Sequence, residues 1–317
     1  MKQPIAPALQ QSSLWAYLQL LRPANILTAW ADIFVGFAAA GSLAPNFWAD
    51  LWAGAPDLAG PPWVSLAWLI LATTGLYGGG ITFNDVFDAE LDARERPERP
   101  LPSGRATLGG AIALGSGCLL GGAIAAAQVS LISALLAVAV ATAALLYDKY
   151  GKHHPLLGPL NMGLCRGGNL LLGVSVAPAI LAERWYLALI PIVYIAAVTA
   201  ISRGEVSGGK RQTGIIALIL VGVAIGGLLG LGVLSAYSVA IASPFAVLFA
   251  VLVVPAFLRA TRDPSVENVR NAVRAGILSL IVLDSVVAAG FGGWPYGLLV
   301  LALLPLSKTV AKAFAMT

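Results

Sequence analysis

Long apolar runs recur along the whole chain, separated by short polar connections. A helix that crosses a bilayer needs about 20 apolar residues, so these runs predict ten membrane-spanning helices. The predicted spans are Ala24–Ala44, Trp63–Phe83, Thr107–Ala127, Ser130–Leu146, Leu156–Leu181, Trp185–Ile201, Thr213–Leu234, Ser238–Leu258, Val273–Phe291 and Pro295–Ser307. Several connections are so short that the helices they join must form antiparallel hairpins.

The composition agrees with an integral membrane protein. Of the 317 residues, 58% are apolar and only 11% are charged, whereas about a quarter of the residues are charged in a soluble domain. The first 21 residues lack the apolar stretch and cleavage site of a signal peptide. We therefore expect a cytoplasmic N-terminal segment, residues 1–22, followed by a single transmembrane domain, residues 23–312.

The basic residues predict the orientation of the spans. If the ten spans alternate in direction, the lysines and arginines gather on one side, except Arg184 and the intramembrane Arg166. Excess positive charge marks the cytoplasmic side. We expect both termini and the connections at 84–105 and 202–212 to be cytoplasmic, in a multi-pass protein of a bacterial inner membrane. The net charge of +4 is explained by these cytoplasmic basic residues, so we expect no nucleic-acid partner.

An acidic segment follows the second predicted span. Asp85, Asp88 and Asp92 are spaced i, i+3, i+7, which on a helix confines them to an arc of about 60°. Like charges on one face repel, so a cation is expected among them. Oxygen ligands favour Mg²⁺ or Mn²⁺ over zinc. The alternative is a solvated linker of mixed charge, and the position beside a membrane span in a chain poor in acids favours the metal.

The same segment reads N-D-x-x-D-x-x-x-D from Asn84 to Asp92, and R-P-x-P-S-G from Arg99 to Gly104. This pattern resembles the UbiA superfamily of intramembrane prenyltransferases. The stretch Leu21–Asn25, Tyr147 with the basic residues after it, Asn161 and Arg166 are also similar, so the likeness covers about residues 20–260. Within the superfamily, the chain looks closest to the EboC-like subgroup, whose acceptor is not established.

The resemblance implies an all-α polytopic fold with nine to ten transmembrane helices around a central cavity; the family's usual number is nine. It also implies Mg²⁺-dependent transfer of a prenyl group from an isoprenoid diphosphate to a small-molecule or lipid acceptor within the membrane. The implied metal ligands, which include the catalytic acids, are Asn84, Asp85, Asp88, Asp92 and Glu205. The implied substrate-binding residues are Asn84, Arg99, Tyr147, Lys149, Lys152, Asn161, Arg166, Lys210 and Arg211.

The family's second acidic motif, D-x-x-G-D or a close variant, is altered in this chain. In Ser202–Arg211, Glu205 takes the place of the first acid, and Gly209 takes the place of the second. One carboxylate remains where the family has two, so a second Mg²⁺ would be held more weakly or through water. Because the two motifs follow the second and sixth spans, we expect them on the same face of the membrane.

Three ionisable residues, Asp32, Arg166 and Asp284, lie inside predicted spans. Charges at that depth are costly unless they are paired or face a cavity. We expect Arg166 to pair with Asp32 or Asp284. Such a pair would either help to bind the diphosphate or the acceptor, or hold the helices together.

Two other functions fit part of the sequence. Buried charges and proline-interrupted spans are typical of a transporter or lipid flippase, although most acids gather at one membrane face. The loss of an acid at Gly209 fits a non-catalytic carrier of prenyl lipids. A CDP-alcohol phosphotransferase is disfavoured because its D-G-x-x-A-R signature is absent from the chain.

Overall fold

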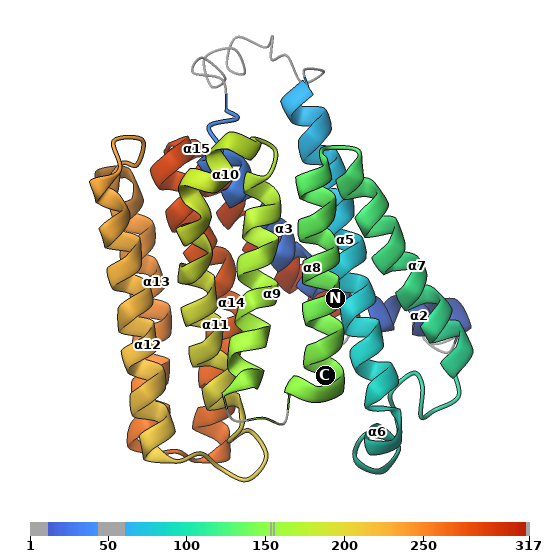
Figure 1. Cartoon of the computed structure of the whole chain (residues 1–317). Coiled ribbons are helices and arrows are strands. Elements are labelled where there is room, and N and C mark those ends of the chain that lie inside the picture. The colour runs from blue at the N-terminus through green and yellow to red at the C-terminus, as the bar shows by residue number, and fades with distance from the viewer. Residues whose placement is uncertain (1–11, 44–60, 153, 155, 315–317) are drawn as a thin grey trace, which may run out of the picture.

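Helices make up all the regular secondary structure in the described part of the chain, which is residues 12–43, 61–152, 154 and 156–314 of a computed structural model (Figure 1). The α-helices are α2 (Ser13–Leu21), α3 (Pro23–Ala39), α5 (Pro61–Phe87), α6 (Ala89–Glu95), α7 (Leu108–Ala127), α8 (Leu131–Leu146), α9 (Leu157–Val174), α10 (Pro178–Arg184), α11 (Leu189–Ser202), α12 (Arg211–Gly230), α13 (Val239–Arg262), α14 (Val266–Gly292), α15 (Trp294–Leu301) and α16 (Leu303–Phe314). One π-helical segment, η1 (Tyr147–Gly151), and two 3₁₀ segments, η2 (Trp185–Ala188) and η3 (Leu231–Val233), extend this set. The predicted all-α fold class is confirmed.

Eight helical segments are long and apolar enough to cross a membrane. They are Pro62–Phe87, Leu108–Ala127, Leu131–Gly151, Pro178–Ser202, Arg211–Val233, Val239–Arg262, Val266–Gly292 and Trp294–Phe314. The other two predicted spans correspond to α3 and α9, which have 17 and 18 residues and carry polar side chains in the interior. Residues 1–11 of the predicted N-terminal segment, and Ala44 at the end of the first predicted span, lie outside the described residues.

One predicted boundary is wrong. The span predicted as Leu156–Leu181 ends at Val174, and a separate short helix, α10, begins at Pro178. Proline disfavours a helical conformation in the residue before it, and Ala177 is accordingly extended, with φ −122° and ψ 90°. Proline itself is well suited to the first turn of a helix. The break at Pro178 therefore shortens α9 and turns the chain into α10.

The buried helix α3 lies at the centre of the packing. Its apolar side chains contribute to two hydrophobic clusters, one with α11, α13 and α14 and the other with α5, α7 and α8. On its α9 side, Gly36 and Gly173 let the two backbones touch. A Cβ atom on Gly36 would come within 2.5 Å of the Val174 amide nitrogen, and one on Gly173 within 2.7 Å of the Ile33 carbonyl oxygen. Small residues at such crossings allow close packing of membrane helices.

This crossing gives a first prediction. Gly36→Ala is expected to destabilise the protein by about 1–3 kcal/mol, because the added methyl group meets backbone that cannot move aside cheaply. The control is Gly222→Ala in α12, where a Cβ would meet no atom within 4 Å. That change should be neutral, or stabilising by up to about 1 kcal/mol. Melting temperatures in detergent check both, and equal values for the two variants would contradict the packing argument.

The connections that carry the two acidic motifs lie at one end of the bundle, together with the segment that follows α8. We call this end the motif end, and it comprises Asn84–Arg105, the described residues of Tyr147–Leu156, and Ser202–Lys210. Figure 1 shows α6 and the connection from α11 to α12 at the same end of the helices. An Arg203 guanidinium nitrogen donates to the carbonyl oxygen of His154, which ties two of these segments together. Both acidic motifs therefore lie at the same end of the helical bundle.

Candidate active site

Asp85 and Asp92 are bound by arginines. The helix predicted to carry the three aspartates is interrupted at Asp88, between α5 and α6, although the Asp88 and Asp92 amides still donate to carbonyl oxygens four residues earlier. Arg22 donates to Asp85 Oδ1 at 2.6 Å, and Arg99 donates to Asp92 Oδ2 at 2.7 Å and to Asp85 Oδ1 at 3.5 Å. Two arginine side chains of the protein therefore lie beside these two buried carboxylates.

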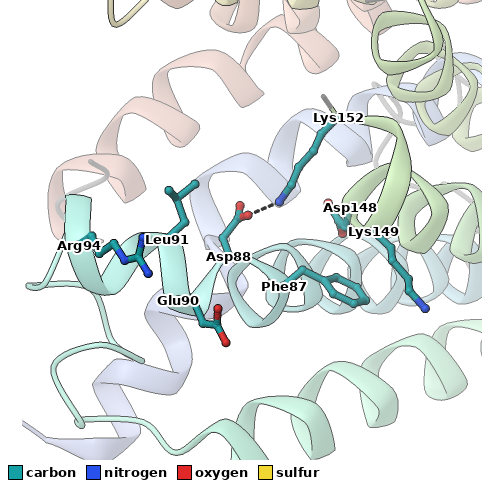
Figure 2. Close-up of a pocket in the computed structure, with 8 residues that line it drawn as sticks. All are labelled: Phe87, Asp88, Glu90, Leu91, Arg94, Asp148, Lys149 and Lys152. Carbon is teal, nitrogen blue, oxygen red and sulfur yellow. Dashed lines mark hydrogen bonds and ion pairs between the residues drawn. The ribbon is translucent and has the colours of Figure 1, made fainter. Parts of the chain in front are cut away.

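Asp88, unlike Asp85 and Asp92, lines a pocket beside the segment that follows α8. Its carboxylate pairs with the ammonium of Lys152 (Figure 2). The pocket has a volume of about 370 Å³ and is lined by Phe87, Asp88, Glu90, Leu91, Arg94, Asp148, Lys149 and Lys152. The first acidic motif on α5 and α6 thus faces the basic segment that ends α8. Lysines and carboxylates in one pocket suit a ligand that carries both phosphate and metal.

Asp148 is a functional candidate that the sequence reasoning missed. It lies in η1, is buried, and accepts a hydrogen bond from Asn84 Nδ2 at 2.8 Å on Oδ1. Its position could have indicated a role, because an acid stands between Tyr147 and Lys149 at the end of a predicted span. The whole chain has only 15 acidic residues. The hydrogen bond links the first residue of the acidic motif to the segment that carries Lys152.

Three further residues predicted to bind substrate, Tyr147, Lys149 and Asn161, lie in η1 and α9. Lys149 is exposed, and its ammonium lies 5.0 Å from the centre of the Tyr150 ring, a cation–π contact. Tyr147 is half-buried at the end of α8. Asn161, on α9, lies beside Gly151, since a Cβ on that glycine would be 3.4 Å from Asn161 Nδ2. The structure therefore gathers these residues at the motif end, but only Lys149 and Lys152 line the pocket.

The second motif does not reach this pocket. Glu205 is half-buried, and burial raises the pKa of its carboxyl while Arg270 and Arg96 act to lower it. The Glu205 carbonyl oxygen also accepts from Arg270 Nε at 3.0 Å. Lys210 and Arg211 are exposed at the start of α12 and, like Glu205, are not among the residues that line the pocket. The second acidic motif therefore contributes no residue to the lining of the pocket in this conformation.

Residues 42–203 match the model of the UbiA prenyltransferase family, over about half of the 317 residues. The chain belongs to the UbiA prenyltransferase family. The matched region contains the pocket and the first acidic motif. The second motif begins where the match ends.

Curated relatives are similar over about half of the chain, and solved structures share its fold. The digeranylgeranylglyceryl phosphate synthase of Methanosarcina barkeri is 31% identical over 168 residues, which are 52% of this chain and 56% of that protein. The chain spans about half the length of the curated relatives it matches. The apo structure of a UbiA homolog from Aeropyrum pernix K1 has a TM-score of 0.66 at 17% identity, covering 82% of this chain and 96% of that one. A UbiA homolog from Archaeoglobus fulgidus bound to GPP and Mg²⁺ has a TM-score of 0.50 at 15% identity, covering 94% and 99%.

This UbiA family member also contains a buried ion-paired trio, Asp32, Arg166 and Asp284, on α3, α9 and α14. Arg166 Nη2 lies 3.2 Å from Asp32 Oδ1 and 3.9 Å from Asp284 Oδ2. Arg166 also donates to the side chain and the backbone of Thr28, and Asn169 donates to Asp32 Oδ2 at 2.9 Å. The predicted pairing of Arg166 is confirmed. Both carboxylates and the guanidinium are buried, so the trio joins three helices.

The oxygen donors around the pocket fit a hard cation. Among the described residues, no three His, Cys, Asp or Glu side chains converge closely enough to hold a metal ion by themselves. Mg²⁺ does not require such a cage, because it usually takes one or two carboxylates and completes its octahedron with water and phosphate oxygens. Asp88 and the Asn84 amide, one helical turn apart, fit that requirement.

Proposed function

We propose that this UbiA family member transfers a prenyl group from an isoprenoid diphosphate to an acceptor within the membrane. The observation that carries the proposal is the pairing of Asp88 with Lys152 in a pocket where the acidic motif meets the basic segment after α8. An isoprenoid diphosphate has an anionic head and an apolar tail. A charged pocket at the end of an apolar helical bundle suits both parts of such a molecule.

The chemistry requires neutralisation of the leaving group. The bond between the first prenyl carbon and a diphosphate oxygen breaks, and its electron pair leaves with the diphosphate. A lone pair of the acceptor forms the new bond to this carbon, and the acceptor proton passes to the released diphosphate or to water. Lys152, Lys149 and Arg94 line the pocket and would bind diphosphate oxygens. Such preorganised charges stabilise a developing anion more strongly than water does.

Mg²⁺ would be held by Asp88 and Asn84, and would supply further charge neutralisation to the diphosphate. Asp85 and Asp92 already pair with Arg22 and Arg99, so they would join the metal site when those arginines turn to the substrate. The homolog that binds GPP and Mg²⁺ supports this assignment by its fold. Mn²⁺ and a second, weaker site at Glu205 remain predictions from the motif.

The relatives suggest a class of acceptor to test first. Their name describes a glyceryl phosphate that carries two geranylgeranyl groups, so we infer a lipid of the glyceryl phosphate type, whose hydroxyl would be the nucleophile. This inference takes the place of the predicted likeness to the EboC-like subgroup, which these relatives do not support. We also infer that the motif end is cytoplasmic, as the distribution of basic residues predicts.

One observation favours a second candidate, a non-catalytic carrier of prenyl lipids. Glu205 faces Arg270 and Arg96 instead of the pocket, so the second motif adds no acid to the site in this conformation. A carrier would bind a prenyl diphosphate without breaking its bond to carbon. The transporter alternative receives no comparable support, because the intramembrane charges pair with one another.

The test is Mg²⁺-dependent consumption of radiolabelled geranylgeranyl diphosphate by the purified protein in lipid nanodiscs, with geranylgeranylglyceryl phosphate as the acceptor. We expect pyrophosphate release that is abolished by EDTA and restored by Mg²⁺. Tight binding without pyrophosphate release would favour the carrier. Movement of the labelled lipid across a vesicle membrane without bond cleavage would favour a flippase.

A further inference from the structure

The hydrogen bond between Asn84 and Asp148 joins two elements that meet at the pocket. Asn84 is on the last turn of α5, four residues before Asp88, so the two side chains lie on the same helix face. Asp148 is in η1, which also leads to Lys152. Asp148 lines the pocket, and Asn84, which is not among the lining residues, donates Nδ2 to Asp148 Oδ1 at 2.8 Å.

The direction of this hydrogen bond is set by the acid. An ionised carboxylate accepts hydrogen bonds and donates none, so it can receive only the NH₂ end of an amide. An asparagine side chain without such a partner could present either its oxygen or its nitrogen to a cation. With Nδ2 held by Asp148, Oδ1 is the end of the Asn84 amide left to ligate a metal beside Asp88.

We propose that Asp148 is a positioning residue: it fixes the Asn84 amide so that the carbonyl oxygen, and not the NH₂ group, is offered to the divalent cation. The proposal rests on the proposed function, in which Asn84 and Asp88 hold Mg²⁺. Partners that orient metal ligands typically contribute about 10–100-fold to metal affinity. Asp148 is buried, so its orientation is held by the surrounding protein.

The experiment measures Mn²⁺ binding without turnover. Mn²⁺ binds at the same kind of oxygen-ligand site as Mg²⁺. Its EPR signal differs between the free and the bound ion, so the bound fraction can be measured. The purified protein is titrated in the presence of geranyl S-thiolodiphosphate, an analogue that ionises too slowly to react. Asp148→Asn is expected to weaken Mn²⁺ binding by about 10–100-fold, because the amide introduced by this change can present either of its ends to Asn84.

Two further variants separate positioning from charge and from folding. The exchanged pair Asn84→Asp with Asp148→Asn keeps one amide and one carboxylate, now with the amide as the donor from position 148. It should recover Mn²⁺ affinity to within a few-fold of the wild type. The matched control is Glu95→Gln, which removes an exposed carboxylate at the end of α6, outside the residues that line the pocket. This change should alter the affinity by less than about three-fold.

The outcomes are distinct. A wild-type protein that binds no Mn²⁺ would overturn both the proposed metal site and the role of Asp148. If the wild type binds but Asp148→Asn binds equally well, or loses no more affinity than Glu95→Gln, the positioning role is overturned and the proposed function stands. A lower melting temperature of Asp148→Asn with unchanged Mn²⁺ affinity would show that the hydrogen bond only ties α5 to η1.

Discussion

Replacement of Arg166 by methionine is expected to lower the free energy of unfolding by about 3–5 kcal/mol. The guanidinium is the only cation that the described residues place within 4 Å of Asp32 and Asp284. Its loss leaves two fully buried carboxylates without an opposite charge, and it removes the hydrogen bonds to Thr28. We expect a fall in both the yield of folded protein and the melting temperature in detergent.

The acidic partners provide the compensating test. Asp284 has no hydrogen-bond partner for either carboxylate oxygen within the described structure, so Asp284→Asn should cost little or be stabilising. In the Arg166→Met background, the added changes Asp32→Asn and Asp284→Asn should restore most of the lost stability. Arg211→Met, at an exposed arginine, is the control, with an expected effect within about 0.5 kcal/mol. Equal melting temperatures for Arg166→Met and Arg211→Met would refute the ion-pair argument.

The largest effect on turnover is expected for Asp88→Ala. Asp88 is the motif aspartate that lines the pocket, so its loss removes the proposed metal carboxylate and releases Lys152 from its partner. We expect pyrophosphate release to fall by about 10²–10³-fold, the scale of removing one group that stabilises a transition-state charge. The measurement is the initial rate at saturating prenyl diphosphate over a series of Mg²⁺ concentrations.

Two comparisons make this result specific. Glu95→Gln, at an exposed acid at the end of α6, should retain nearly the full rate. Lys152→Met should also slow the reaction, but through weaker binding of the diphosphate, so its KM should rise more than in Asp88→Ala. Full metal-stimulated activity in the double variant Asp85→Ala with Asp88→Ala would end the enzymatic assignment.

Much of the helical arrangement could be predicted because the lipid environment leaves few alternatives. Backbone groups in hydrocarbon must bond within a helix, so runs such as Leu108–Ala127 and Val239–Arg262 are evident almost directly in the amino-acid pattern. The helix α3 was predicted despite its interior Asp32, because its apolar length outweighed one charge. The break before Pro178 was missed, since hydropathy continues across it while the helical backbone does not.

The partners of the site residues were harder to predict. Arg22 and Asp85 are far apart in the chain, and no periodicity relates them, yet they form an ion pair. Spacing placed the three aspartates near one another, but it did not reveal that Asp88, unlike the other two, lines the pocket beside Lys152. Asp148 was missed because one acid at the end of an apolar run resembles an ordinary interfacial residue until its neighbours are known.

The trio on α3, α9 and α14 has a consequence for biosynthesis. Helices enter the membrane in the order in which the ribosome makes them, and a lone charge at mid-bilayer opposes insertion by about 2.5–3.5 kcal/mol. A nascent chain that stops before α9 therefore carries an unmatched Asp32, whereas one that includes Arg166 can neutralise it at once. We expect the early helices to stay beside the insertion machinery until α9 arrives, and α14 to join a pair that has already formed.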